Sequence, residues 1–219
     1  MVCYCEIWQP GESEKAFIER VLPLEKATRF THDKRRAQSF CAYILAEYML
    51  CDMLGFAPAK IGFTKQGAPF FKECALRFSV SHSGEYAACI IDESVCGVDI
   101  ERIRPIPERV KRGIFTGEEL EFLQGVDGEK DAVTLWTMKE AYVKTLGKGI
   151  SRGIAEVSFV KEGKLADVEG LTLSSAVAGD YVLTWVMAAR CGEDSALNKP
   201  IVIEAERIRE FVRQINRSI

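Results

Sequence analysis

Two helical patterns, one in each half of the 219-residue chain, limit the folds that this sequence can form. In residues 34–54 apolar side chains recur at intervals of three to four, and residues 132–146 form a second helical segment that ends at Gly147. Strand-like segments flank both helices, so we expect an α+β fold with antiparallel or mixed sheets. The expected strands cover residues 1–8, 77–81, 87–92, 94–100, 157–160, 171–174, 181–189 and 200–203, and shorter helices cover residues 12–22, 118–123 and 205–215.

Pro105 and Pro107 interrupt the pattern between the two long helices and predict a hinge there. We therefore expect an N-terminal lobe over residues 1–103 and a C-terminal lobe over residues 104–219. Each lobe would be a small, mostly antiparallel sheet packed on its long helix. The sequence shows no strict internal repeat.

Composition and charge argue against several classes of protein. The net charge of −3 disfavours a general nucleic-acid binder, and no apolar run reaches the roughly 18 residues of a membrane span. The eight cysteines include no Cys-x-x-Cys pair, and several lie within apolar runs, which favours buried free thiols. Because no signal-peptide pattern is evident either, we expect a protein of the reducing cytoplasm.

Asp99 and Glu101 stand two residues apart in the strand-like segment Gly97-Val98-Asp99-Ile100-Glu101. Because side chains alternate along a strand, both carboxylates point to one face while Val98 and Ile100 point into the core. A hard divalent cation such as Mg²⁺ would relieve the repulsion between the two carboxylates. The alternative is an acidic edge that faces solvent.

The helix of residues 132–146 carries Trp136, Glu140 and Lys144 at intervals of four, and hence on one face. A surface ion pair between Glu140 and Lys144 would explain two of these residues, but not the position of Trp136. Residues 147–149, Gly-Lys-Gly, follow either as a flexible helix cap or as a loop that approaches a phosphate closely.

His82 lies among hydroxyl side chains in residues 79–84, between two expected strands. Ser81 and Ser83 offer hydrogen bonds to a phosphate, and His82 adds positive charge when it is protonated. A purely structural turn is one alternative. A serine hydrolase is another, but the segment lacks the Gly-x-Ser-x-Gly pattern of such enzymes, and neighbouring residues of a strand point in different directions.

In this order and spacing, the three segments resemble those of the 4′-phosphopantetheinyl transferases of the larger, two-lobed, surfactin-synthetase-activating type. The resemblance rests on residues 78–84, 97–101 and 136–149. Residues 115–119 resemble the family's Phe-Ser-x-x-Glu element, and residues 26–30 its basic N-terminal stretch. The resemblance implies a pseudo-dimer of two similar α+β lobes, sufficient as a monomer, with coenzyme A in the cleft between them.

The activity that this resemblance implies is Mg²⁺-dependent transfer of the 4′-phosphopantetheine group from coenzyme A to a serine of an apo acyl or peptidyl carrier protein, releasing 3′,5′-ADP. By position, Asp99, Glu101 and Glu140 would be the metal ligands, with Mn²⁺ as an alternative to Mg²⁺. Glu140, or a water that it orients, would deprotonate the acceptor serine. Lys144 would stabilise the pyrophosphate or protonate the leaving group, and His82 would contact a phosphate.

The resemblance also implies which residues contact coenzyme A. At two positions that would contact the nucleotide end of coenzyme A, this chain departs from the family pattern. Ala68 stands where the family commonly has a lysine, and Gln38 where it often has an arginine, although Arg35 or Arg36 offers a substitute. These departures therefore concern the binding of the 3′-phosphate of coenzyme A. The implied contact residues are Lys26, Arg29, Gly67, Pro69, Ser81, His82, Asp99 and Lys144.

Two other functions remain open from the sequence. One is a non-catalytic module that binds coenzyme A or a carrier protein, a reading that the Ala68 and Gln38 departures motivate. Binding alone does not need three carboxylates and a lysine in register, which argues against it. The other is a metal-dependent nucleotide hydrolase, which would cleave coenzyme A without a protein acceptor.

Overall fold

The computed structural model describes residues 1–27, 33–125, 128–147, 154–155, 157–166, 168–190 and 199–218. Its helices are α1 (Glu12–Val21), α2 (Leu24–Ala27), α3 (Asp33–Tyr48), α4 (Glu108–Ile114), α5 (Gly117–Gln124), α6 (Gly128–Thr145) and α7 (Ala205–Ser218). Its strands are β1 (Val2–Glu6), β2 (Ile61–Phe63), β3 (Pro69–Phe71), β4 (Arg77–Ser83), β5 (Tyr86–Asp92), β6 (Cys96–Arg102), β7 (Val160–Lys161), β8 (Lys164–Leu165), β9 (Leu171–Ala178), β10 (Tyr181–Ala188) and β11 (Ile201–Val202).

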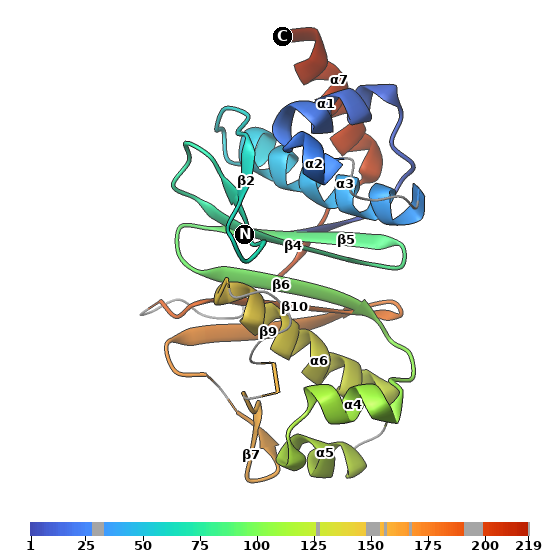
Figure 1. The fold of residues 1–219 in the computed structure, drawn as a ribbon, viewed down its shortest axis with the longest axis vertical. Coiled ribbons are helices and arrows are strands. Elements are labelled where there is room, and N and C mark those ends of the chain that lie inside the picture. Colours follow the sequence, from blue (N-terminus) through green and yellow to red (C-terminus); the bar gives the residue numbers. More distant parts are fainter. Residues whose placement is uncertain are drawn as a thin grey trace.

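Two sheets lie between the two long helices, α3 on one side and α6 on the other (Figure 1). The first sheet has the strand order β11-β1-β5-β4 and the second the order β6-β10-β9. Neighbouring strands are antiparallel except for β1 and β11, which are parallel. The α+β class, with a mostly antiparallel sheet on each long helix, is thus confirmed. That the two halves are similar copies stays a prediction.

The last described segment returns to the first sheet. β11 pairs with β1, and α7 packs against α1 (Figure 1). The lobe boundary expected between residues 103 and 104 stays a prediction. Strand β11 and helix α7 follow this boundary in sequence but lie beside elements that precede it. No helix in the described ranges is both long enough and apolar enough to cross a membrane.

Several short elements differ from what the sequence indicates. The first long helix is α-helical only to Tyr48, and a π-helical turn, η1 (Met49–Met53), continues it towards Gly55. Helix α4 and the β2–β3 hairpin had no predicted counterpart. Helix α4 fully buries none of its side chains and packs only Val110 and Ile114 partly against the core, which is too few positions to show a helical period. Three-residue strands are likewise too short to show alternation.

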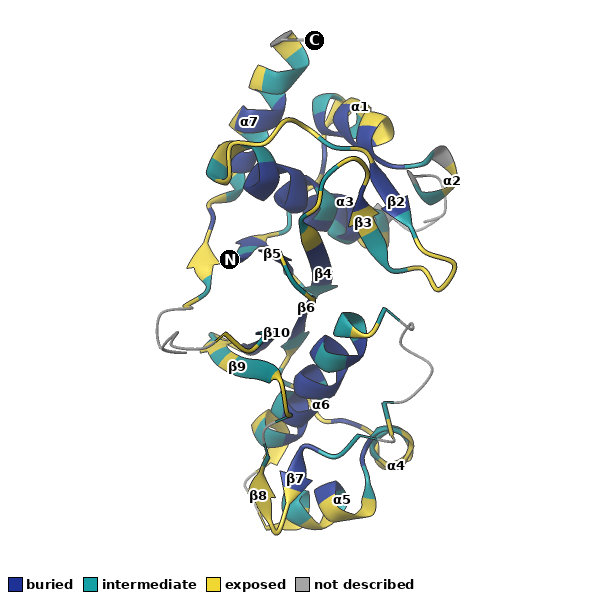
Figure 2. Ribbon diagram, turned by 90° about the vertical axis from the view of Figure 1, so that its left-hand side faces the viewer, coloured by how far each residue is buried: buried dark blue, intermediate teal, exposed yellow. Residues whose placement is uncertain are grey.

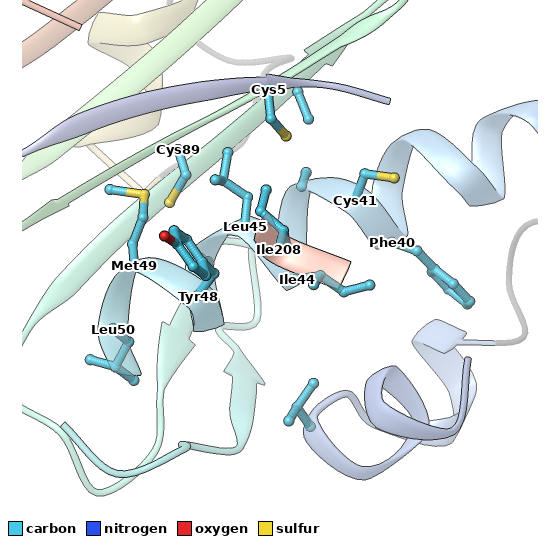
Figure 3. Packing of buried hydrophobic residues seen from close by; sticks show 14 of the residues in the cluster. Cys5, Phe40, Cys41, Ile44, Leu45, Tyr48, Met49, Leu50, Cys89 and Ile208 are labelled. Atoms are coloured by element: carbon cyan, nitrogen blue, oxygen red, sulfur yellow. The ribbon is translucent and has the colours of Figure 1, made fainter. Parts of the chain in front are cut away.

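The core of the first sheet lies between its strands and α3 (Figures 2 and 3). Tyr48 of α3 and the cysteines Cys5, Cys41 and Cys89 are all buried in this core. Burial raises the pKa of the Cys41 thiol to about 12, so it stays protonated and acts as a small apolar group. The expected free thiols are confirmed for the described cysteines, while Cys191 lies outside the described residues.

Candidate active site

Strand β6 places Asp99 and Glu101 on the face that helix α6 covers. Gly97 lies on the same face, and a Cβ atom built there would overlap the backbone carbonyl oxygen of Ala141. Because position 97 is a glycine, α6 rests directly on β6 at this point. The alternate residues Val98 and Ile100 face the other way and are buried between the sheets. The alternation expected for residues 97–101 is therefore what the strand shows.

Helix α6 contributes a lysine that reaches both sheets. The Nζ atom of Lys144 lies 2.9 Å from Oδ1 of Asp99 and 2.8 Å from the carbonyl oxygen of Val98, both on β6. It also lies 3.4 Å from the carbonyl oxygen of Val80 on β4. Lys144 thus donates hydrogen bonds to the neighbouring edges of the two sheets and holds one positive charge beside Asp99.

One cavity of about 360 Å³ gathers the three segments that the sequence singles out. Its walls come from α3, β4, β6 and α6, so segments far apart in the chain meet there. The predicted metal ligands all line it, and so do Ser81 and His82, two of the predicted phosphate contacts of β4. The lining residues are Ser39, Ala42, Tyr43, Val80, Ser81, His82, Asp99, Glu101, Trp136, Glu140 and Lys144.

Burial and mutual repulsion change the protonation of the carboxylates. Burial, and after it the negative charge of Asp99, raise the pKa of Glu140 to about 7, although Lys144 and Trp136 lower it in part. The pKa of Glu101 is raised for the same two reasons. At neutral pH, Glu140 therefore lies near the midpoint of its titration, as suits a group that accepts and releases a proton.

The same carboxylates offer the oxygen ligands that a hard divalent cation prefers. The Oδ2 atom of Asp99 is buried and has no hydrogen-bond partner in the described part of the chain. Such an oxygen is costly unless a cation or a water lies beside it. Across the described residues, no three His, Cys, Asp or Glu side chains lie close enough together to hold a metal ion, so the three predicted ligands do not form a preassembled site. The donor set fits a divalent cation.

The side chains of β4 meet the carboxylates through hydroxyl groups. The Oγ atom of Ser81 donates to Oδ1 of Asp99 at 2.6 Å, and that of Ser83 donates to Oε2 of Glu101 at 2.7 Å. His82 lines the cavity as well, and burial, followed by the charge of Lys144, lowers its pKa. The contact of His82 with a phosphate stays a prediction.

A second cavity, of about 410 Å³, holds two of the residues predicted for the nucleotide end of coenzyme A. Gly67 and Pro69 line it, together with Ala68, and Gly67 has a positive φ of 90° that favours glycine. This cavity shares lining residues with the first, so the two are neighbours. The shared residues are Tyr43, Val80 and Lys144.

In the described part of the chain, the structure does not bring the basic residues predicted to bind the nucleotide to either cavity. Lys26 lines neither cavity, and its Nζ atom lies 4.5 Å from the ring centroid of Phe63. Arg29 lies outside the described residues. The Nε2 atom of Gln38 donates to the carbonyl oxygen of Gly84 at 2.9 Å, so this side chain supports the β4–β5 turn.

A buried ion pair next to Glu140 had no counterpart in the sequence interpretation. The Nζ atom of Lys139 lies 2.5 Å from Oε2 of Glu119, and both side chains are fully buried. Glu119 also accepts hydrogen bonds from the backbone nitrogens of Phe159 and Thr116. It thus joins α5, α6 and the segment before β7. The Thr-x-x-Glu spacing of a helix capping box signals Glu119, but no local pattern signals Lys139 as its partner.

Comparisons with known proteins point to one family. The family model for the 4′-phosphopantetheinyl transferase superfamily matches residues 95–186, which include β6, α6 and most of β10. The chain is 30% identical to 4′-phosphopantetheinyl transferase HetI of Nostoc sp. (strain PCC 7120) over 185 residues, 77% of this chain and 78% of that protein. It is 29% identical to 4′-phosphopantetheinyl transferase Sfp of Bacillus subtilis (strain 168) over 150 residues, 64% and 66% of the two chains.

A further relative is 4′-phosphopantetheinyl transferase psf-1 of Bacillus pumilus, which is 31% identical over 133 residues. This alignment covers 58% of the present chain and 56% of psf-1, so the chain spans little more than half the length of that relative.

Proposed function

Because the chain belongs to the 4′-phosphopantetheinyl transferase superfamily, we propose that it transfers the 4′-phosphopantetheine group from coenzyme A to a serine of an apo carrier protein. The other product is 3′,5′-ADP. The observation that supports this most is the cavity in which Asp99, Glu101, Glu140 and Lys144 meet. A binding module has no need of a carboxylate with a near-neutral pKa beside a lysine, whereas proton transfer and charge stabilisation require both.

In this reaction, the oxygen of the acceptor serine attacks the pyrophosphate phosphorus that carries the pantetheine group. The bond from that phosphorus to the bridging oxygen breaks, and 3′,5′-ADP leaves with the bridging oxygen. Glu140 accepts the serine proton, directly or through a water, because a base with a pKa near 7 is matched to neutral pH. Lys144 places a positive charge beside the pyrophosphate or protonates the leaving group.

Asp99, Glu101 and Glu140 would hold the metal ion, with Mg²⁺ as the expected ion and Mn²⁺ as the alternative. Bound there, it would neutralise pyrophosphate charge as a Lewis acid. For coenzyme A, we propose that Gly67 and Pro69 form the wall of the nucleotide end and that His82 donates a hydrogen bond to a phosphate. Contacts with Lys26 and Arg29, the monomeric state and the cytoplasmic location stay predictions.

A mass measurement tests the transfer. Several unrelated apo carrier proteins are incubated with coenzyme A, Mg²⁺ and the full chain, and one phosphopantetheine group should be added to at least one carrier. No mass gain on any of them would contradict the proposal. Asp99→Asn and Glu140→Gln should abolish transfer while circular dichroism shows an unchanged fold. Glu129→Gln, on an exposed position of α6, serves as the matched control and should retain transfer.

The same assay separates the two rival functions. Without a carrier protein, a nucleotide hydrolase would still release 3′,5′-ADP from coenzyme A at the full rate, whereas a transferase requires the acceptor. A binding module would bind coenzyme A in calorimetry and yet leave every carrier unmodified.

A further inference from the structure

Two edge strands meet at the centre of the molecule without sharing a sheet. β4 ends the first sheet and β6 begins the second, and the two strands lie side by side (Figure 1). Within the described residues they are therefore joined by side chains in place of a backbone ladder. Alternate positions 79, 81 and 83 of β4 are serines, and each of the three hydroxyl groups reaches across to β6.

The three serines do different things on β6. The Oγ atom of Ser79 accepts a hydrogen bond from the backbone nitrogen of Val98 at 3.3 Å and touches no carboxylate. The Oγ atom of Ser83 also accepts a hydrogen bond from the backbone nitrogen of Arg102 at 3.4 Å. Ser81 and Ser83 donate to Asp99 and Glu101, at 2.6 and 2.7 Å. These are short bonds, as expected between a hydroxyl group and a charged carboxylate. The carboxylates of β6 are thus held from the β4 side.

A serine hydroxyl has one proton to donate. In Ser81 and Ser83 that proton is already engaged with a carboxylate, so neither group is free to donate to a phosphate oxygen. The sequence suggested phosphate donors at both positions, and the contacts indicate another role. Holding one oxygen of each carboxylate leaves the other available, and in Asp99 that second oxygen, Oδ2, is the buried atom without a partner.

We propose that Ser81 and Ser83 are positioning residues that fix the orientations of Asp99 and Glu101 for the divalent cation. This inference rests on the proposed function, because it assumes a cation at these carboxylates. Without the two hydroxyl groups, neighbouring carboxylates on one strand face would turn apart to reduce their repulsion. With the two hydroxyl groups in place, the fold already holds the two like charges close together before the ion binds.

Ser83→Ala is the sharpest test, because Ser83 does not line the cavity that Ser81 lines. Mn²⁺ binding to the full chain is followed by electron paramagnetic resonance, without coenzyme A. We expect Ser83→Ala to weaken Mn²⁺ binding about tenfold or more, the usual effect of removing a partner that orients a metal ligand. Ser83→Thr keeps the hydroxyl group and should restore binding. Ser79→Ala removes a serine of the same strand that contacts no carboxylate and should leave Mn²⁺ affinity unchanged.

A kinetic measurement excludes general damage to the fold. In the transfer assay, Ser83→Ala should raise the Mg²⁺ concentration needed for half-maximal rate, while kcat at saturating Mg²⁺ stays close to that of the wild type. Unchanged metal affinity with a raised KM for coenzyme A would overturn the inference and return Ser83 to the phosphate. Equal losses in Ser79→Ala and Ser83→Ala would overturn it in favour of a purely structural role.

The outcome for the wild type separates this inference from the proposed function. If the wild type transfers the group and binds Mn²⁺, but Ser83→Ala binds it equally well, only the positioning role fails. If the wild type binds no Mn²⁺, the proposed metal centre fails together with it.

Discussion

The Nζ atom of Lys144 lies 2.9 Å from Oδ1 of Asp99, and this ion pair joins helix α6 to strand β6. The Lys144 side chain is 18% exposed and that of Asp99 6%, so solvent screens the pair only in part. Lys144 also lowers the pKa of the neighbouring Glu140. One cation thus influences both the proposed metal ligand and the proposed base.

The first prediction concerns Lys144→Met. Loss of the positive charge raises the pKa of Glu140 further, and a base acts only in its deprotonated form. We therefore expect a lower kcat/KM and a shift of the rising limb of the pH–rate profile to higher pH. The comparison uses wild type and variant at equal Mg²⁺ concentration. A profile that keeps its position would show that Lys144 does not influence the base.

The close approach of α6 to β6 gives a second prediction. In Gly97→Ala the new methyl group would overlap the carbonyl oxygen of Ala141, which pushes the helix away from the strand. We expect a loss of about 1–3 kcal/mol in the free energy of unfolding, as for overpacked cores, and a large loss of transfer. Gly113→Ala is the control, because nothing lies within 4 Å of a Cβ atom at that helical position. It should be neutral or slightly stabilising in urea unfolding.

A third prediction concerns the buried pair of Lys139 and Glu119. Lys139→Met leaves the carboxylate of Glu119 buried without its cation, which costs about 3–5 kcal/mol of unfolding free energy. Lys130→Met, on an exposed position of the same helix, should change stability little. Chemical denaturation of the two variants measures the difference. Equal stabilities would mean that the pair of Lys139 and Glu119 does not hold α6 in place.

The fourth prediction concerns Glu47, which is fully buried in α3. Its Oε1 atom has no partner among the described residues, and Oε2 accepts a hydrogen bond from the backbone nitrogen of Ala59 at 3.2 Å. Burial raises the pKa of Glu47 from an ordinary 4.5 to about 8. The folded state therefore keeps a proton that the unfolded state loses between these pH values, and stability falls as pH rises from 4.5 to 8.

Glu47→Gln is uncharged at every pH and retains the acceptor for the Ala59 nitrogen. Urea unfolding at pH 5 and at pH 8 should show a smaller difference in unfolding free energy for Glu47→Gln than for the wild type. Glu19→Gln, at an exposed position of α1, is the control and should behave as the wild type. If the wild type and Glu47→Gln show the same difference in unfolding free energy between pH 5 and pH 8, Glu47 is ionised without cost.

Local patterns were sufficient to predict much of the site. The two-residue alternation of 97–101 correctly placed Asp99 and Glu101 on one face, and the four-residue spacing of α6 placed Glu140 with Lys144. These relationships depend only on neighbours in sequence. The sequence therefore predicted which side chains share a face within each element.

Relationships between distant elements could not be predicted in the same way. The contact of Ser83 with Glu101 depends on two sheets meeting edge to edge, and no local period encodes that meeting. Lys139 is fully buried, against the strong tendency of lysine to lie at the surface, because Glu119 arrives from another helix. Both features depend on tertiary packing.

The return of β11 and α7 to the first sheet has a consequence for the order of folding. The second sheet is built from β6, β9 and β10, which lie between residues 96 and 188, so all its strands are synthesised before β11. The first sheet pairs Tyr4 with Val202 and cannot close until that distant segment has been synthesised. Contacts of such sequence separation form slowly. The half that carries β1 and α3 therefore completes its core last. Until β11 and α7 have packed against it, its exposed apolar surface makes this half the more prone to aggregation.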